Sequence, residues 1–237
     1  MSITSGSTLS ARRPSAARAL TLAALLVASG CTRVLQGNGV FAQQERSVAP
    51  FSGVQVEDGI AGIVTAGGAF GVQVSGDANV VDDTQTEVIA DPTGAEVLRV
   101  RVADEHYVPI HPLTVVVTLP ALSVVRARSA ASVTASAVAA GTLTVEASGG
   151  GAVTVSGAGG ATLEATVAGS AQGAELHAGG YPVETAHLAL SGGSRAEVDA
   201  SAGVDGTAAA GCAVVNDGAG ACGLEDPATQ APVRCGP

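Results

Sequence analysis

The stretch that decides the fold runs from residue 124 to residue 216 and contains SVTAS (132–136), LTVEA (143–147), VTVSG (153–157) and LEATV (163–167). Segments of this kind, in which apolar and polar side chains alternate, recur about every ten residues and are separated by Gly, Ser and Ala. Alternation with a period of two is typical of a β-strand with one buried face. Its regular recurrence predicts a repetitive all-β body, which can be built without any pocket.

The same stretch contains an internal repeat. Ala130, Ala152, Ala174 and Ala196 follow one another at a constant interval of 22 residues. Two strands per interval predict one coil of a solenoid, in which each coil of 20–22 residues buries its inward Val, Leu and Ala side chains against the next. The apolar phase slips by one residue after the segment 148–157, which predicts a β-bulge.

The composition limits the thickness of the core. Apolar residues make up 46% of the 237 residues, but aromatic residues make up only 2%, and the chain has 32 glycines and no tryptophan. A core of Val, Ala and Leu side chains must be thin, which favours a narrow solenoid or closely stacked sheets.

The charge balance is acidic: outside the first 31 residues, the chain has 8 arginines and 21 acidic residues. We expect no nucleic-acid partner, because such a surface repels phosphate, and we attribute the acidity to solubility.

Residues 46–120 carry longer strand patterns, separated by turns rich in Gly and Asp. The segment LTVVVTL (113–119) is apolar almost throughout, so we expect both of its faces to be covered. Helix signals are nearly absent after residue 31. The expected strands are Ser52–Val56, Ile60–Thr65, Phe70–Ser75, Thr86–Ala90, Val97–Ala103 and Leu113–Leu119.

Residues 1–30 are interpreted as a lipoprotein signal peptide. Three arginines precede the apolar run 19–28, which is too short to span a bilayer as a helix of about 20 residues. The run ends in Ala-Ser-Gly-Cys31, which resembles the bacterial lipobox, where the cysteine is diacylated and becomes the new amino terminus. An ordinary signal peptide and a twin-arginine signal at Arg12-Arg13 stay open as alternatives. We expect an exported protein anchored through Cys31 to a bacterial membrane, at the outer membrane, the cell surface or the periplasmic face, with residues 31–45 as a tether.

Three further cysteines, Cys212, Cys222 and Cys235, lie close to the carboxy terminus. Export favours a disulfide, but three thiols allow one bond with one cysteine left over, and the sequence does not choose the pair. The spacings fit no zinc site, and His187 lies well upstream. We therefore expect no metal and no cofactor, and we expect residues 217–237 to form a tail or cap stapled by the disulfide.

A series of short motifs follows a known order. The matching segments are Gly37-Asn38-Gly39, Arg46, Phe51–Val56, Val72–Asn79, Leu98–Val100 and Leu113–Val117. Together they resemble the putative auto-transporter adhesin head GIN domain, a bacterial family of unknown function. The resemblance covers residues 37–216 and implies a right-handed parallel β-helix-like solenoid, here over residues 46–216, on an exported and often lipid-anchored protein. It supplies no catalytic residues.

The histidines give no signature of catalysis. His106, His111, His177 and His187 stand in no HExxH motif and in no nucleophile–base arrangement. In the 22-residue frame His177 takes the place of Val155 and Asp199 in other coils, which predicts an outward-facing side chain. We therefore predict no catalytic, cofactor-binding or metal-binding residues.

Two classes of function remain. A non-catalytic, adhesin-like interaction module at the cell surface or envelope needs only the predicted architecture. A β-helix hydrolase or lyase acting on envelope polysaccharide needs acidic side chains that converge from adjacent coils. The candidates for such a cluster are Glu146, Glu164, Glu175, Glu197 and Asp199.

Overall fold

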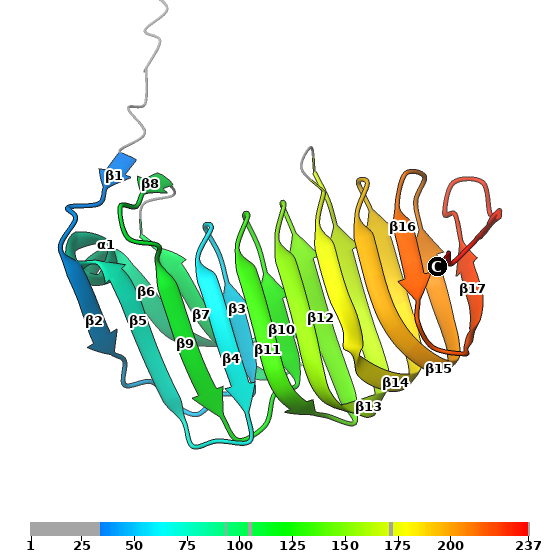
Figure 1. Cartoon of the computed structure of the whole chain (residues 1–237), viewed down its shortest axis with the longest axis horizontal. Coiled ribbons are helices and arrows are strands. Elements are labelled where there is room, and N and C mark those ends of the chain that lie inside the picture. The colour runs from blue at the N-terminus through cyan, green and yellow to red at the C-terminus, as the bar shows by residue number, and fades with distance from the viewer. Residues whose placement is uncertain (1–33, 93, 104–105, 171–172, 237) are drawn as a thin grey trace, which may run out of the picture. The chain divides into compact units, whose positions relative to one another are not determined.

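The computed structural model describes residues 34–236 except 93, 104–105 and 171–172, and the described chain is mostly β (Figure 1). The strands before residue 120 are β1 (Val34–Gln36), β2 (Phe41–Glu45), β3 (Gly53–Val56), β4 (Ala61–Ala66), β5 (Gly71–Asp77), β6 (Thr84–Ala90), β7 (Glu96–Val102), β8 (His106–Val108) and β9 (Thr114–Leu119). The later strands are β10 (Val124–Ala127), β11 (Ser132–Ala139), β12 (Thr142–Ser148), β13 (Ala152–Ala168), β14 (Glu175–Ser191), β15 (Arg195–Ala208), β16 (Ala213–Asn216), β17 (Ala221–Glu225) and β18 (Pro232–Val233). The predicted all-β class is confirmed. One short helix, α1 (Ala78–Asp83), is the exception among the described residues.

Strands β1 and β8 form a small parallel sheet, and the other strands join into one large curled mixed sheet with two walls (Figure 1). The first wall consists of β9, β4, β11, the leading parts of β13, β14 and β15, and β16. The second wall consists of β7, β3, β10, β12, the trailing parts of β13, β14 and β15, and β17. Neighbouring strands within each wall are parallel. From β10 onward the chain runs alternately along one wall and the other, and we call one such circuit, which adds one strand segment to each wall, a pass.

The spacing between passes differs from the predicted repeat. Ser132 pairs with Ala152, and Ala152 pairs in turn with Glu175 on the next pass. Glu175 pairs with Arg195, and Arg195 with Ala213. These passes are unequal in length, the longest beginning at Ala152 and the shortest at Arg195, so the constant 22-residue interval was wrong. The predicted slip is present, because the register between β13 and β14 shifts after the pair formed by residue 154.

Alternation along the strands places the core between the two walls. Val153 and Val155 of the first wall, and Leu163, Ala165 and Val167 of the second, are all buried, while the residues between them face outward. Burial of such side chains stabilises the fold by about 25 cal/mol for each Å² of apolar surface removed from water. Most of the inward side chains are Val, Leu or Ala, as the composition predicts.

Strand β9 corrects the expectation that both faces of residues 113–119 would be covered. Val115 and Val117 are completely buried, whereas Val116 is only half-buried. Only one face of β9 lies on the core, because β9 is a member of the first wall between β5 and β4.

Residues 34–45, expected to form part of a tether, belong to the fold. Strand β1 pairs with β8, and β2 pairs in the antiparallel direction with β5. The segment FAQQE (41–45) has a single large apolar side chain and therefore lacks the alternation that marks the later strands. The lipidation site predicted at Cys31 lies outside the described residues.

Both ends of the core are covered. At the amino-terminal end, α1 buries Val80 and Val81. At the other end the second wall continues past residue 216 into β17, and the tail folds back, with β18 antiparallel to β17 and Gly236 bridged to Val215 of β16. A solenoid-like stack needs such caps, because its terminal strands would otherwise expose apolar surface and unpaired backbone groups.

A disulfide joins this tail to the second wall. Cys222 of β17 is bonded to Cys235, with their Cα atoms 5.9 Å apart, and Cys212 is a free cysteine. The bond closes a loop across 13 positions of sequence and holds the tail over the end of the core.

Candidate functional site

The outward side chains of both walls are mostly small and polar. They form rows across successive strands, because residues in register in parallel strands lie side by side. Outward threonines and serines of the first wall are Thr65, Thr114, Thr118, Ser132, Thr134, Ser136, Thr154 and Ser156. Those of the second wall are Thr142, Thr144, Ser148, Thr162, Thr166, Thr185, Ser191 and Thr207.

A trough of about 320 Å³ crosses the outer face of the second wall between β12 and β15. Glu164 and His187 are in register and line it together with Thr144, Thr166 and Ala189. The trough is open to solvent along its length, which suits an extended polymer better than an enclosed small molecule.

His187 carries the polar chemistry of this trough. Its register partners are Glu164 on β13 and Asp205 on β15, and its Nδ1 atom is paired with a carboxylate oxygen of Asp205. The three side chains form a row of acid, imidazole and acid along the surface, all of them exposed. Such a row offers both donors and acceptors to a bound hydroxyl-rich chain.

A second row of charges on the same wall is saturated by internal ion pairs. Arg128 donates from both Nε and a terminal nitrogen to the two carboxylate oxygens of Glu146, each at 2.7 Å. These hydrogen bonds are the main reason that the pKa of Arg128 is raised. Arg126 lies between the same Glu146, at 3.3 Å, and the carboxylate of Asp91. Glu146 therefore serves to hold two arginines.

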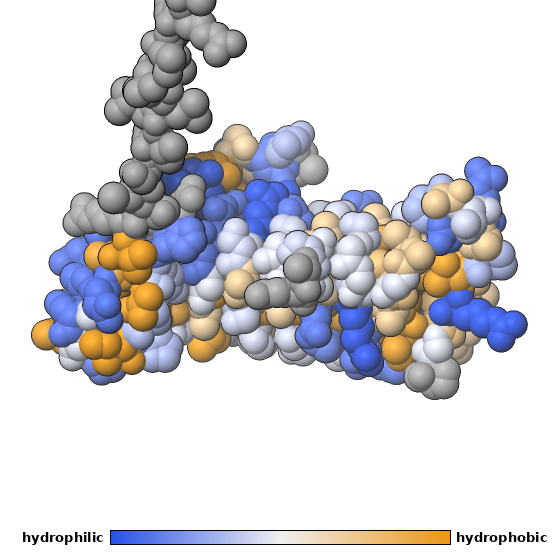
Figure 2. All heavy atoms as spheres, turned by 90° about the horizontal axis from the view of Figure 1, so that it is seen from above, coloured by the Kyte–Doolittle hydropathy of each residue, from blue (hydrophilic) through white to orange (hydrophobic). Residues whose placement is uncertain are grey.

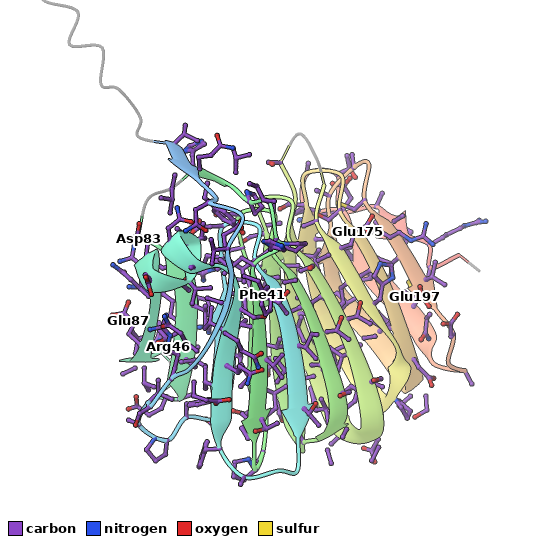
Figure 3. All side chains as sticks on the ribbon, turned by 60° about the vertical axis from the view of Figure 1, so that its left-hand side comes forward. Phe41, Arg46, Asp83, Glu87, Glu175 and Glu197 are labelled. Carbon is purple, nitrogen blue, oxygen red and sulfur yellow. A yellow bond between two sulfur atoms is a disulfide. The ribbon has the colours of Figure 1, made fainter. Side chains whose placement is uncertain are left out.

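Two of the other candidate acids, Glu175 and Glu197, lie on the first wall (Figure 3). His177 contacts Glu175 at 3.3 Å through Nε2 and Glu197 at 3.5 Å through Nδ1. His177 is outward-facing, as expected, but its register partners are Thr154 and Glu197 rather than Val155 and Asp199. Asp199 lies farther along β15, in register with Pro182.

The five candidate acids thus do not converge on one site. Glu146 and Glu164 face outward from the second wall, Glu175 and Glu197 belong to the first wall, and Asp199 lies in β15 past the register shift that follows Ala178. No group of three or more His, Cys, Asp or Glu side chains within the described part of the chain is arranged to hold a metal ion.

Tyr181, the single aromatic residue of the repeat region, is unavailable as a platform for a sugar ring. Its side chain is completely buried, and its hydroxyl donates a hydrogen bond to the carbonyl oxygen of Ala140 at 3.2 Å. Burial raises the pKa of this hydroxyl. Tyr181 is therefore a core residue, and none of the described residues that line the trough is Phe, Tyr or Trp.

A polar hollow of about 550 Å³ lies at the ends of β7 and β8 and the turns beside them, lined in part by Glu57, Arg101, His106 and Ser129. Tyr107 adjoins it, and burial, followed by the charge of Asp58, raises the pKa of its hydroxyl to about 12. The phenol therefore stays protonated. The lining of this hollow comes from strand ends and turns rather than from successive strands of one wall, so it lacks the repeated register of the trough.

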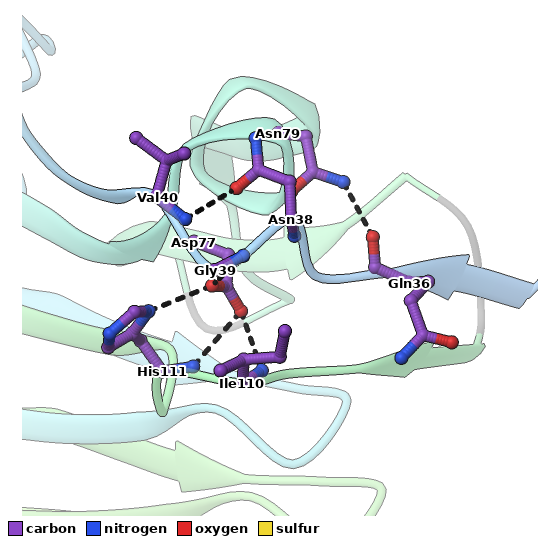
Figure 4. Close-up of polar contacts among 8 residues, drawn as sticks. All are labelled: Gln36, Asn38, Gly39, Val40, Asp77, Asn79, Ile110 and His111. Carbon is purple, nitrogen blue, oxygen red and sulfur yellow. Dashed lines mark hydrogen bonds and ion pairs between the residues drawn. The ribbon is translucent and has the colours of Figure 1, made fainter.

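Asp77 lies at the centre of a polar network that sequence reasoning missed (Figure 4). Its carboxylate is completely buried and accepts hydrogen bonds from the backbone N–H groups of Gly39, Ile110 and His111, at 3.0, 2.7 and 3.1 Å. It also contacts Nδ1 of His111 at 2.9 Å. Desolvation alone would raise the pKa of Asp77, but the hydrogen bonds outweigh it and lower the pKa below the usual 3.8.

Asn79 completes this network. It accepts from the backbone N–H of Asn38 and donates to the carbonyl oxygen of Gln36. The motifs Gly-Asn-Gly at 37–39 and Gly-Asp-Ala-Asn at 76–79, distant in sequence, are therefore one structural unit that ties the start of the described chain to β5 and to the segment after β8. Their presence in the same chain was the available signal, but nothing in the sequence showed that they meet.

No helix among the described residues combines the length and the apolar character needed to cross a bilayer.

The chain is similar to known proteins in sequence pattern and in fold. The family described as "Putative auto-transporter adhesin, head GIN domain" matches residues 50–220. A solved structure of a "putative adhesin" from Bacteroides fragilis is 15% identical with a TM-score of 0.59, and the match covers 80% of this chain and 94% of that chain. A "putative adhesin" from Parabacteroides merdae is 14% identical with a TM-score of 0.44, covering 82% of this chain and 92% of that chain. None of the curated proteins compared with the chain matches it. At such low identity, the first of these structures shows a shared fold alone.

Proposed function

Because the chain belongs to the auto-transporter adhesin head GIN domain family, as its short motifs indicated, we propose that it is an exported, lipid-anchored β-solenoid that acts as a non-catalytic interaction module of the bacterial envelope. The parallel register of each wall, to which every pass adds one strand segment, supports the solenoid. Parallel crossover connections are right-handed in about 98% of cases, which supports a right-handed coil.

The observation that carries the binding function is the trough on the second wall. Its floor is a rigid run of paired strands, and its polar groups repeat from one strand to the next, as an extended ligand requires. Glu164, His187 and the neighbouring threonines can exchange hydrogen bonds with hydroxyl groups. The partner that fits this chemistry best is a linear polysaccharide of the envelope or the extracellular space.

Binding can be tested by filling the trough. Ala189 is exposed and lies in the trough, so Ala189→Arg should block a polymer and lower glycan binding by about tenfold or more. The matched control is Ala213→Arg, which places the same side chain on an exposed alanine of the first wall. The measurement is binding of the full chain to immobilised envelope and capsular polysaccharides. Equal binding by both variants would exclude the trough.

The row Glu164–His187–Asp205 also favours a second candidate, a hydrolase or lyase of envelope polysaccharide. A carboxylate beside a histidine can supply acid–base groups. The same binding assay separates the two functions, because an interaction module releases the polysaccharide at its original length, whereas an enzyme shortens it.

Anchoring is tested at Cys31. Insertion of acyl chains contributes about 0.8 kcal/mol per buried CH₂, so Cys31→Ser should move the protein from the detergent phase to the aqueous phase. Cys212→Ser, which removes the free cysteine of the fold, should leave partitioning unchanged. Retention of the Cys31→Ser protein in the detergent phase would contradict lipidation at this position.

A further inference from the structure

Large apolar side chains are exposed around the point where the described chain begins. Seven large hydrophobic residues are exposed in the part of the chain that the structure describes, and five of them belong to β1, β2, β8 and the segments next to them. We name these five the apolar rim: Val34, Val40, Phe41, Val108 and Ile110, with exposed fractions between 49% and 60%.

The rim is one surface. Val34 and Val108 lie at the two ends of the β1–β8 ladder, in register with His106 and Gln36 respectively. A Cβ atom on Gly39, next to Val40, would lie 3.5 Å from Cδ1 of Ile110. The ring of Phe41 meets that of His111, the neighbour of Ile110, edge to face, with centroids 5.8 Å apart. Figure 2 shows apolar residues gathered over the end of the body formed by the first strands.

The rim is also held rigidly. The buried carboxylate of Asp77 binds the backbone of Gly39 and Ile110 at the same time, so the segments that carry Val40, Phe41 and Ile110 are fixed to one another. Exposed apolar side chains that are fixed in this way are preformed for contact with another apolar phase, because no ordering of the chain is needed on binding.

The short stretch of chain between Cys31 and β1 indicates that the apolar phase in contact with the rim is the lipid bilayer. Only three peptide steps separate Cys31 from Val34, which span about 10 Å even when fully extended. If Cys31 carries acyl chains, as proposed above, Val34 lies within this distance of the lipid headgroups. The rim then begins within reach of the bilayer boundary, where apolar side chains are stabilised.

We propose that the apolar rim docks on the bilayer that holds the lipid anchor, so that the body sits against the membrane with the rim as its contact surface. This inference rests on the proposed acylation of Cys31. Because the protein as a whole is acidic, an anionic bilayer would repel it. We therefore expect the rim to dock on a bilayer of zwitterionic lipids, which has no net charge.

The absence of tryptophan from the sequence allows a direct test. Phe41→Trp places a single reporter in the rim, and Ile110→Trp provides a second, independent one. Ile63→Trp is the matched control, because Ile63 is 47% exposed but lies on the outer face of β4. Each full-length variant, isolated with its lipid, is reconstituted into phosphatidylcholine vesicles with or without bromine atoms on the acyl chains near the headgroups.

Docking predicts blue-shifted emission from Trp at positions 41 and 110, reduced to about half or less by the brominated lipid, with no change at position 63. Equal emission at all three positions, with Cys31 shown to be acylated by mass spectrometry, would overturn docking alone. A Cys31 without acyl chains would overturn the anchor and docking together. A blue shift that depends on protein concentration and not on lipid would assign the rim to a second copy of the chain, which also overturns the proposal.

Discussion

Replacing Gly159 by alanine is expected to lower the free energy of unfolding by about 3 kcal/mol or more. Gly159 lies in β13 where the chain passes from the first wall to the second, at a φ of +89°. Left-handed backbone costs an alanine about 1–2 kcal/mol. A Cβ atom there would also lie 2.1 Å from the carbonyl oxygen of Pro182 on the next pass. Because this neighbour is backbone, the clash can be relieved only by moving the two passes apart, which adds to the loss.

Two other glycines separate the causes of this loss. Gly193 has a φ of +72° but open space around it, so Gly193→Ala should cost only the backbone term of about 1–2 kcal/mol. Gly141 has neither a positive φ nor a neighbour within 4 Å, so Gly141→Ala should change stability by about 0.5 kcal/mol or less. Urea denaturation of the three variants checks this order. Equal stability of the Gly159 and Gly193 variants would show that adjacent passes can move apart.

Asp77→Asn is expected to shift the unfolding equilibrium by more than about tenfold toward the unfolded state at neutral pH, because the amide turns an acceptor into a donor. In the wild type, Oδ2 accepts from the N–H groups of both Ile110 and His111. An amide nitrogen at that place would face two donors and leave them without partners. The alternative amide orientation would instead affect the contacts of Gly39 and the His111 ring.

The same substitution predicts a change in pH dependence. The pKa of Asp77 is lowered in the folded protein, so its ionised form stabilises the fold fully above the unfolded pKa of about 3.9. This contribution is lost as pH falls from there through the folded pKa. The difference in stability between wild type and Asp77→Asn should therefore be constant near neutrality and shrink below about pH 4. Chemical denaturation from pH 7 to pH 3 measures it, and a difference that stays constant throughout would show that the pKa of Asp77 is not lowered in the fold.

The sequence allowed the strands and their inward faces to be predicted where alternation was strong. Residues 153–155 and 163–167 show the alternation that the buried positions follow. Alternation did not predict β1 and β2, because these strands are held by pairing with β8 and β5 rather than by a buried stripe of their own. It also failed to anticipate α1, whose six residues are too few to display a helical period.

The candidate site was predictable only as a set of residue types. Glu164, His187 and Asp205 are unequally spaced along the sequence, so the constant repeat inferred from the alanines aligns none of them. Their alignment depends on how many residues each pass uses to cross from the first wall to the second. The register shifts after Thr154 and Ala178 determine that number. In the same way, the union of Asp77 with Gly39 and His111 depends on how the first strands close over the end of the core.

By itself the sequence determined the all-β class, the thin aliphatic core and the family, because alternation, small side chains and short ordered motifs are local properties of the chain. Only the tertiary structure decided which polar residues share a wall, which acids are held by arginines, and where the exposed apolar residues gather. The physical reason is that contacts between passes depend on the summed length of every corner between them, and a change of one residue moves a side chain to the opposite face of its strand.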